Sequence, residues 1–256
     1  MKHGDFTGLA KDYSRYRPGY SGFIVDFICD AVKGKLGNEG LKAVDAGAGT
    51  GIFSRMLAER GFSVLAAEPN NDMRKFGIKD CENYDVTYIE SPAEKIDTED
   101  NSCHLITMAS SFHWPDFDQA IQEFNRILKS NGVFTALWNT RAVERDSITA
   151  DIEKYLQDLV PEMKRKSSGR SEFCDNLTDR LSKCGSFGDA AYLESFHVEK
   201  QTIDHYIGLW RSVNDVQVQA GPERFEKFIN YIKERTNGEP YINAHYQTRV
   251  WVAQKR

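Results

Sequence analysis

Short apolar runs alternate, in the first half of the chain, with segments whose apolar side chains recur every three or four positions. The runs are typical of buried parallel strands, and the wider spacing indicates one face of a helix. A helix over residues 23–31 comes first. The expected strands then cover residues 41–45, 62–67, 86–90, 103–108 and 133–138, and the main helices between them cover residues 52–60 and 117–128. This alternation predicts a parallel sheet with right-handed crossovers.

After Asn139 the rhythm changes from alternation to amphipathic helices with two further strands. The expected helices cover residues 148–159, 173–181, 206–213 and 222–232, and the strands cover 191–198 and 246–253. Pro222 suits the first position of its helix, where a backbone N–H would have no partner. We find no repeat and no linker, and expect one domain over residues 1–256. Its expected parts are an N-terminal lid and helix (1–36), a core (37–140) and helical substrate-side insertions (141–190 and 201–243).

Composition and charge narrow the class of protein. With 256 residues, of which 40% are hydrophobic, the chain can bury a substantial core. A formal net charge of -5 offers no basic surface for nucleic acid, so a small molecule is the expected partner. The first residues lack the apolar stretch of a signal peptide, and no apolar run reaches membrane-spanning length. We therefore expect a cytoplasmic protein without membrane contact, whose oligomeric state stays open.

Metal binding is not expected. The five cysteines form no C-x-x-C pair, and the six histidines show no H-x-x-x-H spacing. We expect free thiols rather than disulfides or a zinc site.

Three glycines follow the first predicted strand, in the segment Asp45-Ala46-Gly47-Ala48-Gly49-Thr50-Gly51. Glycines between a strand and a helix N-terminus let the backbone turn tightly and approach a ligand closely. A dinucleotide fingerprint would place its third glycine at position 52, where this chain has Ile52. The second strand ends at Glu68, whose carboxylate can accept hydrogen bonds from both ribose hydroxyls of an adenosine. An adenosyl cofactor other than NAD is therefore favoured.

The segment D-x-G-x-G-T-G, with an acidic residue ending the second strand, resembles motif I of class I S-adenosylmethionine-dependent methyltransferases. Further motifs follow in the order of that family: Tyr13-x-x-x-Arg17-Pro18-x-Tyr20, Ser91-Pro92-Ala93-Glu94, Phe112-His113-Trp114 and residues 126–132. Together they resemble small-molecule enzymes of the trans-aconitate methyltransferase type, in the methyltransferase domain 11 group. The resemblance implies a Rossmann-like, doubly wound α/β fold. Its seven-stranded, mostly parallel sheet would have an antiparallel last strand, with helical insertions after strand five and between strands six and seven.

The same resemblance implies S-adenosyl-L-methionine as cofactor and S-adenosyl-L-homocysteine as product. The glycine loop would hold the methionine part, Glu68 the ribose, and Pro69 with Met73 the adenine. Many relatives carry an acidic residue where this chain has Pro92, so either Glu94 or a backbone group would contact the polar edge of adenine. The implied cofactor-binding residues are Tyr13, Arg17, Asp45, Gly47, Ala48, Gly49, Gly51, Glu68, Pro69, Met73, Ala93, Glu94 and Ser110.

A second group of aromatic and basic residues is expected at the acceptor. Tyrosine rings can accommodate a sulfonium, and arginine can bind a carboxylate in bidentate fashion. The candidates are Tyr16, Tyr20, His113, Trp114, Trp138, Asn139, Arg141, Trp210 and Arg211. If the acceptor is a hydroxyl or an amine, His113 is the expected general base or orienting residue, because its usual pKa lies near neutrality. A packed corner at His113-Trp114 and an ordinary surface segment at residues 13–20 are the competing interpretations.

The sequence thus predicts in-line methyl transfer to a small-molecule acceptor, such as a carboxylate or a hydroxyl. The main alternative is a non-catalytic S-adenosylmethionine-binding or regulatory protein. An NAD-dependent oxidoreductase is a third possibility. A tRNA or protein methyltransferase is conceivable, but the acidic charge balance argues against a macromolecular acceptor.

Overall fold

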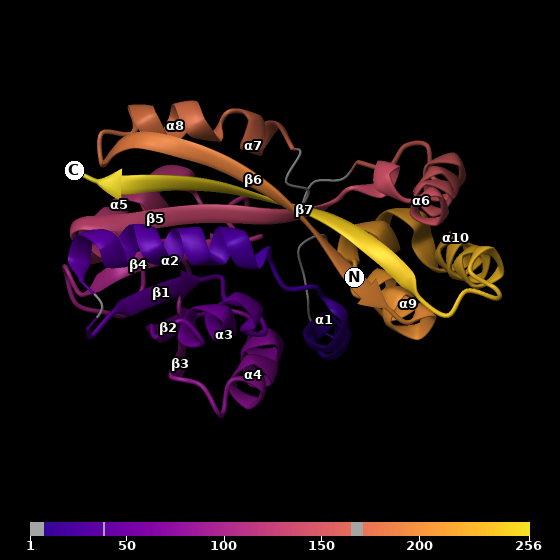
Figure 1. Ribbon diagram of the computed structural model, residues 1–256, viewed down its shortest axis with the longest axis horizontal. Helices are drawn as coiled ribbons and strands as arrows, with labels where there is room; N and C mark the ends of the chain where they lie inside the picture. Colours follow the sequence, from indigo (N-terminus) through magenta and orange to yellow (C-terminus); the bar gives the residue numbers. More distant parts are fainter. Residues whose placement is uncertain (1–7, 38, 165–170) are drawn as a thin grey trace.

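One sheet organises the computed structural model, which describes residues 8–37, 39–164 and 171–256. The strand order is β3-β2-β1-β4-β5-β7-β6 (Figure 1). β7 runs antiparallel to both of its neighbours, and the other pairs are parallel. The fold class is therefore confirmed. The strands are β1 Lys42–Ala46, β2 Ser63–Ala67, β3 Val86–Ile89, β4 Cys103–Ala109, β5 Leu128–Arg141, β6 Phe187–Gln201 and β7 Ile242–Lys255.

Most helices fall where the apolar periodicity predicts them. Their bounds are α1 Ala10–Tyr16, α2 Gly22–Leu36, α3 Ile52–Ala58, α4 Asn71–Asp80, α5 Phe117–Ile127, η1 Val143–Arg145, α6 Ser147–Leu159, α7 Glu172–Asp175, α8 Leu177–Lys183, α9 Ile203–Arg211 and α10 Asn214–Arg235. The short helix α1, the turn η1 and the first half of α10 were not predicted as separate helices, and the helix expected over residues 173–181 is divided into α7 and α8. Within α10 the backbone leaves helical geometry at Gly221, with φ of 72°. Pro222 therefore begins the second half of α10, as predicted.

Two hydrophobic clusters cover the two faces of the sheet. Successive residues of a strand point to opposite faces, and the side chains of β1 and β4 follow this rule. Ala43 and Leu105 pack with α2 and α3, whereas Val44 and Ile106 pack with α5 and α8. Both faces of the parallel sheet are thus covered by helices, which explains why its strands read as continuous apolar runs.

A third cluster lies beyond this core, where β5, β6 and β7 extend toward α6, α9 and α10 (Figure 1). We call α6, α9, α10 and the first residues of β7 the helical lobe. Its buried side chains include Tyr206, Trp210 and Phe228. β5, β6 and β7 have 14, 15 and 14 residues and are longer than their apolar runs indicated. The antiparallel ladder pairs backbone groups beyond those runs, so polar residues also become part of the strands.

Parts of two predicted segments, residues 1–7 of the lid and 165–170 of the first insertion, lie outside the described residues. In the described part of the chain, no helix combines the length and the apolar character needed to cross a membrane. The cytoplasmic location stays a prediction.

Candidate functional site

Two adjoining cavities open at the carboxyl ends of β1 and β4. The chain winds from β1 toward β2 and from β4 toward β5, so these ends lie at a topological switch point, where open α/β sheets bind ligands. We call the cavities the Glu68 cavity, of about 310 Å³, and the Arg141 cavity, of about 280 Å³. Their shared lining comprises Tyr13, Gly47, Gly49, Ala109 and Ser110. One ligand can therefore extend through both.

The glycine loop separates β1 from α3 and turns through left-handed backbone. Gly47, Gly49 and Gly51 have φ of 70°, 58° and 77°. A side chain on Gly47 would also collide with Ser111, whose Cβ lies 2.8 Å from the position of an added Cβ. The first two of these glycines line both cavities, and Ala48 lines the Arg141 cavity. The loop thus presents backbone to both cavities.

Glu68 follows β2 and is held by two backbone N–H groups. Its Oε2 accepts from the Gly49 nitrogen at 2.8 Å, and its Oε1 accepts from the Asn70 nitrogen at 2.7 Å. Burial raises the pKa of this carboxyl, and both hydrogen bonds oppose the rise. The carboxylate is therefore fixed in position, with further lone pairs available to a ligand. Other predicted residues that line this cavity are Pro69, Met73, Ala93 and Glu94.

Asp45 lies beneath the loop rather than in the lining of either cavity. Its carboxylate is fully buried and accepts from Ser54 Oγ at 2.6 Å and from Thr107 Oγ1 at 2.8 Å. It thereby ties β1 to α3 and β4. Burial raises the pKa of Asp45 to about 6, despite the two hydroxyl donors. The structure supports the expected role of Asp45 in holding the loop, but not a direct contact with a ligand.

The N-terminal segment lines the Arg141 cavity with Tyr13, Arg17 and Tyr20. Arg17 is anchored to Ser212: its Nε donates to the hydroxyl at 2.9 Å and its Nη2 to the carbonyl at 3.1 Å. The Tyr20 hydroxyl lies 2.9 Å from Ser110 Oγ. Ser110 has φ of 58°, an uncommon left-handed conformation for a residue with a side chain. Strained backbone of this kind gathers at ligand sites.

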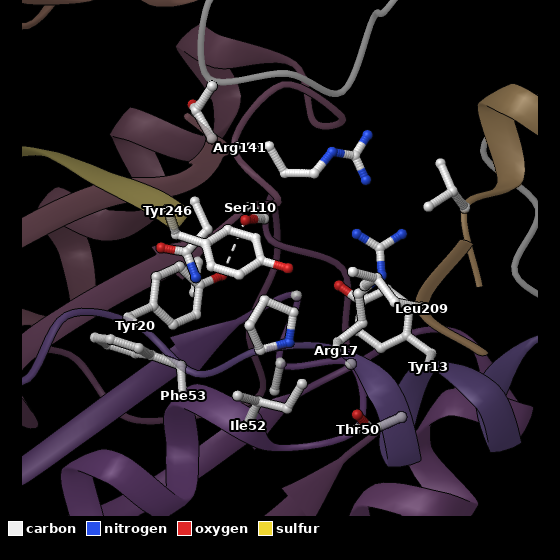
Figure 2. A pocket seen from close by; sticks show the side chains of 18 of the residues that line it. Tyr13, Arg17, Tyr20, Thr50, Ile52, Phe53, Ser110, Arg141, Leu209 and Tyr246 are labelled. Atoms are coloured by element: carbon white, nitrogen blue, oxygen red, sulfur yellow. Dashed lines mark hydrogen bonds between the residues drawn. The ribbon is translucent and has the colours of Figure 1, made fainter. Parts of the chain in front are cut away.

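The helical lobe and the strands leading to it close the opposite side of this cavity (Figure 2). Arg141 lies at the end of β5, with its guanidinium 3.9 Å from the centre of the Trp210 ring. Its Nη2 is 3.8 Å from Glu153 Oε2 of α6. Burial lowers the pKa of Arg141, but Glu153 together with Tyr206, Tyr246 and Asp215 outweighs this effect, and the net shift is upward. The guanidinium is therefore positively charged.

Comparison with known proteins agrees with this geometry. Residues 44–136, which contain the glycine loop and Glu68, match the family described as a methyltransferase domain. This segment of the chain is therefore similar to a methyltransferase domain. An uncharacterized methyltransferase of Mycobacterium tuberculosis (strain H37Rv) is 32% identical over 136 residues, or 53% of this chain and 52% of that protein. The chain thus matches about half the length of this relative.

Solved structures show that the methyltransferase fold extends beyond the matched domain. A protein of Anaeromyxobacter dehalogenans assigned as a type II methyltransferase has a TM-score of 0.68 at 20% identity, over 94% of this chain and 98% of that one. Phosphoethanolamine N-methyltransferase 2 of Haemonchus contortus has a TM-score of 0.53 at 15% identity, over 98% and 57%. At these identities the likeness establishes the fold alone. The trans-aconitate subgroup stays a prediction.

The structure keeps several predicted residues out of both cavity linings. Trp138 Nε1 donates to His113 Nδ1 at 3.3 Å, and the His113 ring lies 4.5 Å from that of Trp114. Of these three residues only Trp114 lines a cavity, the Glu68 cavity. Trp138 is 1% exposed in the core. The His113-Trp114 loop is thus a packed corner with one ring at the cavity, and the structure does not support His113 as a general base.

Four other predicted residues lie outside both cavity linings. Gly51 faces Cys81 and Tyr88, whose atoms lie 2.5 and 2.6 Å from the position of an added Cβ. Tyr16 packs on α9, and its ring lies 5.3 Å from that of His205. Trp210 is fully buried beneath Arg141, and Arg211 pairs with Glu226 at 2.8 Å on the surface. Asn139, by contrast, lines the Arg141 cavity, and its role at the acceptor stays a prediction.

Sequence analysis missed several residues of the Arg141 cavity. They come from distant elements: Pro18, Thr50, Ile52, Phe53, Ala109, Thr140, Val143, Glu153, Leu209, Val213 and Tyr246. Glu153 gave a local signal, since it directly follows Ile152 on the apolar face of the predicted 148–159 helix. A carboxylate beside that face indicates a polar partner, and here the partner is Arg141.

Proposed function

We propose that the chain transfers a methyl group from S-adenosyl-L-methionine to a small-molecule acceptor. The observation that carries this proposal is the continuity of the two cavities across Gly47, Gly49 and Ser110. A cofactor bound through both cavities would direct its methyl group into the Arg141 cavity. A non-catalytic cofactor-binding protein would need no second cavity of this kind.

The residues of the Glu68 cavity fit an adenosine. Glu68 offers a fixed carboxylate to the ribose hydroxyls, and Pro69, Met73 and Ala93 offer apolar surface to the adenine. Pro92 and Glu94 both line this cavity, so the contact to the adenine edge stays open. The Haemonchus contortus neighbour was solved with S-adenosylhomocysteine, which supports a cofactor of this class.

The side of the Arg141 cavity that the glycine loop lines fits the methionine part of the cofactor. Arg17 is the proposed partner of the methionine carboxylate, because its guanidinium is charged and pairs with no carboxylate among the described residues. Ring faces such as that of Tyr13 suit a sulfonium. Asp45 would act from below by holding the loop.

The cofactor supplies the activated methyl group when bound. The chain then orients the acceptor and excludes water, and orientation alone can contribute roughly 7 to 11 kcal/mol. An acceptor that is already nucleophilic, such as a carboxylate, needs no general base. Because His113 lies outside both linings, we assign it no part in the reaction.

Calorimetry with S-adenosylhomocysteine tests this function through a Glu68→Gln variant. The amide keeps the shape but loses the charge, so affinity should fall roughly 10- to 100-fold, as expected for a charge-assisted hydrogen bond. Glu90→Gln is the control, since Glu90 is exposed and pairs only with Arg74 in the described chain. Formation of S-adenosylhomocysteine from S-adenosylmethionine across a metabolite panel would then identify acceptors. NAD binding without any response to S-adenosylhomocysteine would overturn the proposal.

A further inference from the structure

Arg141 is a nearly buried cation whose hydrogen bonds are unmet within the described chain. Its side chain is 16% exposed, and its partners there are the Trp210 ring and Glu153 at 3.8 Å. A separation of 3.8 Å is an ion pair but too long for a hydrogen bond. Buried donors are nearly always paired, and a guanidinium has five of them in a planar fork. The edge of Arg141 that lines the cavity therefore fits an oxygen-bearing ligand.

Other polar atoms lie next to Arg141 at the same end of the cavity. The Tyr246 hydroxyl and Thr140 Oγ1 are buried and have no close hydrogen-bond partner in the described structure, and both residues line the cavity. Figure 2 shows the guanidinium groups of Arg141 and Arg17 and the Tyr246 hydroxyl turned toward the same space. This end of the cavity can thus surround a polar group from several sides.

The charged side chains that line the cavity indicate whether the polar group bound beside Arg141 is an anion or a cation. Among the described residues, the charged side chains in its lining are Arg17, Arg141 and Glu153, which leave one positive charge in excess. The proposed cofactor adds one more, since it carries a sulfonium, an ammonium and a carboxylate. With Arg17 assigned to the cofactor carboxylate, the described carboxylates that act on Arg141 are those of Glu153 and, outside the lining, of Asp215. A neutral acceptor would leave the positive excess unbalanced in a site shielded from water.

We propose that the acceptor is a carboxylic acid and that Arg141 binds its carboxylate as the specificity anchor. This inference rests on the proposed methyltransferase function. A carboxylate is planar and matches the guanidinium fork with two parallel hydrogen bonds. Its single charge also suits the site better than a phosphate dianion, which the Glu153 carboxylate at 3.8 Å from Arg141 would repel.

The test uses full-length protein saturated with S-adenosylhomocysteine and labelled with ¹⁵N-arginine. The probes are benzoate, benzamide and phenyl phosphate, with butyrate and butyramide as a smaller pair. Each carboxylate should move the Arg141 Nε–Hε resonance in a saturable way, and each amide should not. Arg141→Lys keeps the charge but loses the fork, and should weaken carboxylate binding about tenfold or more. Arg145→Gln, an exposed arginine stacked on Phe196, should bind as the wild type does.

Titration with S-adenosylhomocysteine distinguishes a failure of the proposed function from a failure of the carboxylate anchor. If the wild type does not bind it, the proposed function fails. If the wild type binds it but the amides perturb Arg141 as strongly as the acids, or no carboxylate perturbs Arg141, only the carboxylate anchor fails. A preference for phenyl phosphate over benzoate also overturns the carboxylate assignment. Unchanged affinity of Arg141→Lys for S-adenosylhomocysteine shows that this variant is folded, so its loss of carboxylate binding would support the anchor.

Discussion

At the scale of single residues, Asp45 shows how a motif residue can act without touching a ligand. It is fully buried, and its two oxygens accept from hydroxyls of α3 and β4. A buried carboxylate is costly even when hydrogen-bonded, which is why its pKa rises to about 6. The burial of Asp45 beneath the glycine loop therefore makes the stability of the fold dependent on pH.

Folding stability should fall as the pH rises from about 4 to about 6. In this range the folded protein keeps the proton of Asp45, whereas the unfolded chain, with a pKa of 3.8, has lost it. Because the folded state binds more protons, the free energy of unfolding decreases with pH, by roughly 3 kcal/mol for this group. Asp45→Asn should remove this contribution. Urea titrations of both proteins at pH 4 and pH 7 measure the difference, and parallel pH profiles would contradict the assignment.

At the scale of elements, α1 connects the core to the helical lobe across the site. Ser14 donates to Asp80 of α4 on one side. On the other side the Tyr16 carbonyl lies 3.1 Å from His205 Nε2 of α9, and Arg17 bonds Ser212. A short helix of this length has little stability of its own, so these contacts hold it. α1 thus places Tyr13 in the lining of both cavities while it is attached to α4 on one side and to α9 on the other.

Gly208→Ala should loosen the attachment of α1 to α9. An added Cβ would lie 2.5 Å from ring carbons of Tyr16, and such overpacking costs about 1 to 3 kcal/mol. We expect weaker binding and faster dissociation of S-adenosylhomocysteine in stopped-flow measurements. Gly34→Ala is the matched control, because this glycine lies in helix α2 and an added Cβ meets nothing within 4 Å. Wild-type binding by Gly208→Ala would show that this attachment does not support binding.

At the scale of the whole molecule, the two cavities draw on different parts of the fold. The Glu68 cavity is lined by the sheet core and Tyr13, whereas the Arg141 cavity also needs the helical lobe. The lobe has its own hydrophobic cluster, joined to the core through β5, β6 and β7. The adenosine part of the proposed cofactor and the proposed acceptor would therefore be held next to separate clusters.

Phe228→Ala should open the helical lobe while leaving the core intact. Phe228 is fully buried beside Trp210, and removing such a ring costs about 3 to 5 kcal/mol. Hydrogen exchange should rise in α6, α9 and α10 and stay slow in β1 and β4. Phe124→Ala, which removes a buried ring from the core cluster, should raise exchange around the sheet instead. Equal increases everywhere in both variants would show one cooperative unit.

Local patterns in the sequence were sufficient to predict the order of strands and helices along the chain, the glycine turn and the position of Glu68. These features depend on the spacing of apolar side chains, on the positive φ that glycine can adopt and on where a strand ends. Each is set by residues that are near neighbours in the sequence. The resemblance in motifs then led to the sheet topology and the cofactor class. Most of the Glu68 cavity was predictable because its residues follow strand ends of the sheet.

The Arg141 cavity depended on contacts between residues far apart in the chain. The sequence predicted that Arg141 takes part, but not that Trp210 lies beneath it, nor that Glu153 and Tyr246 complete the lining. His113 and Gly51 likewise have residue types suited to a ligand, yet packing against Trp138, Cys81 and Tyr88 keeps them outside the cavities. The sequence by itself determined the sheet core and its cofactor loop. Only the tertiary structure decided the acceptor site, because the direction and neighbours of a side chain depend on long-range packing.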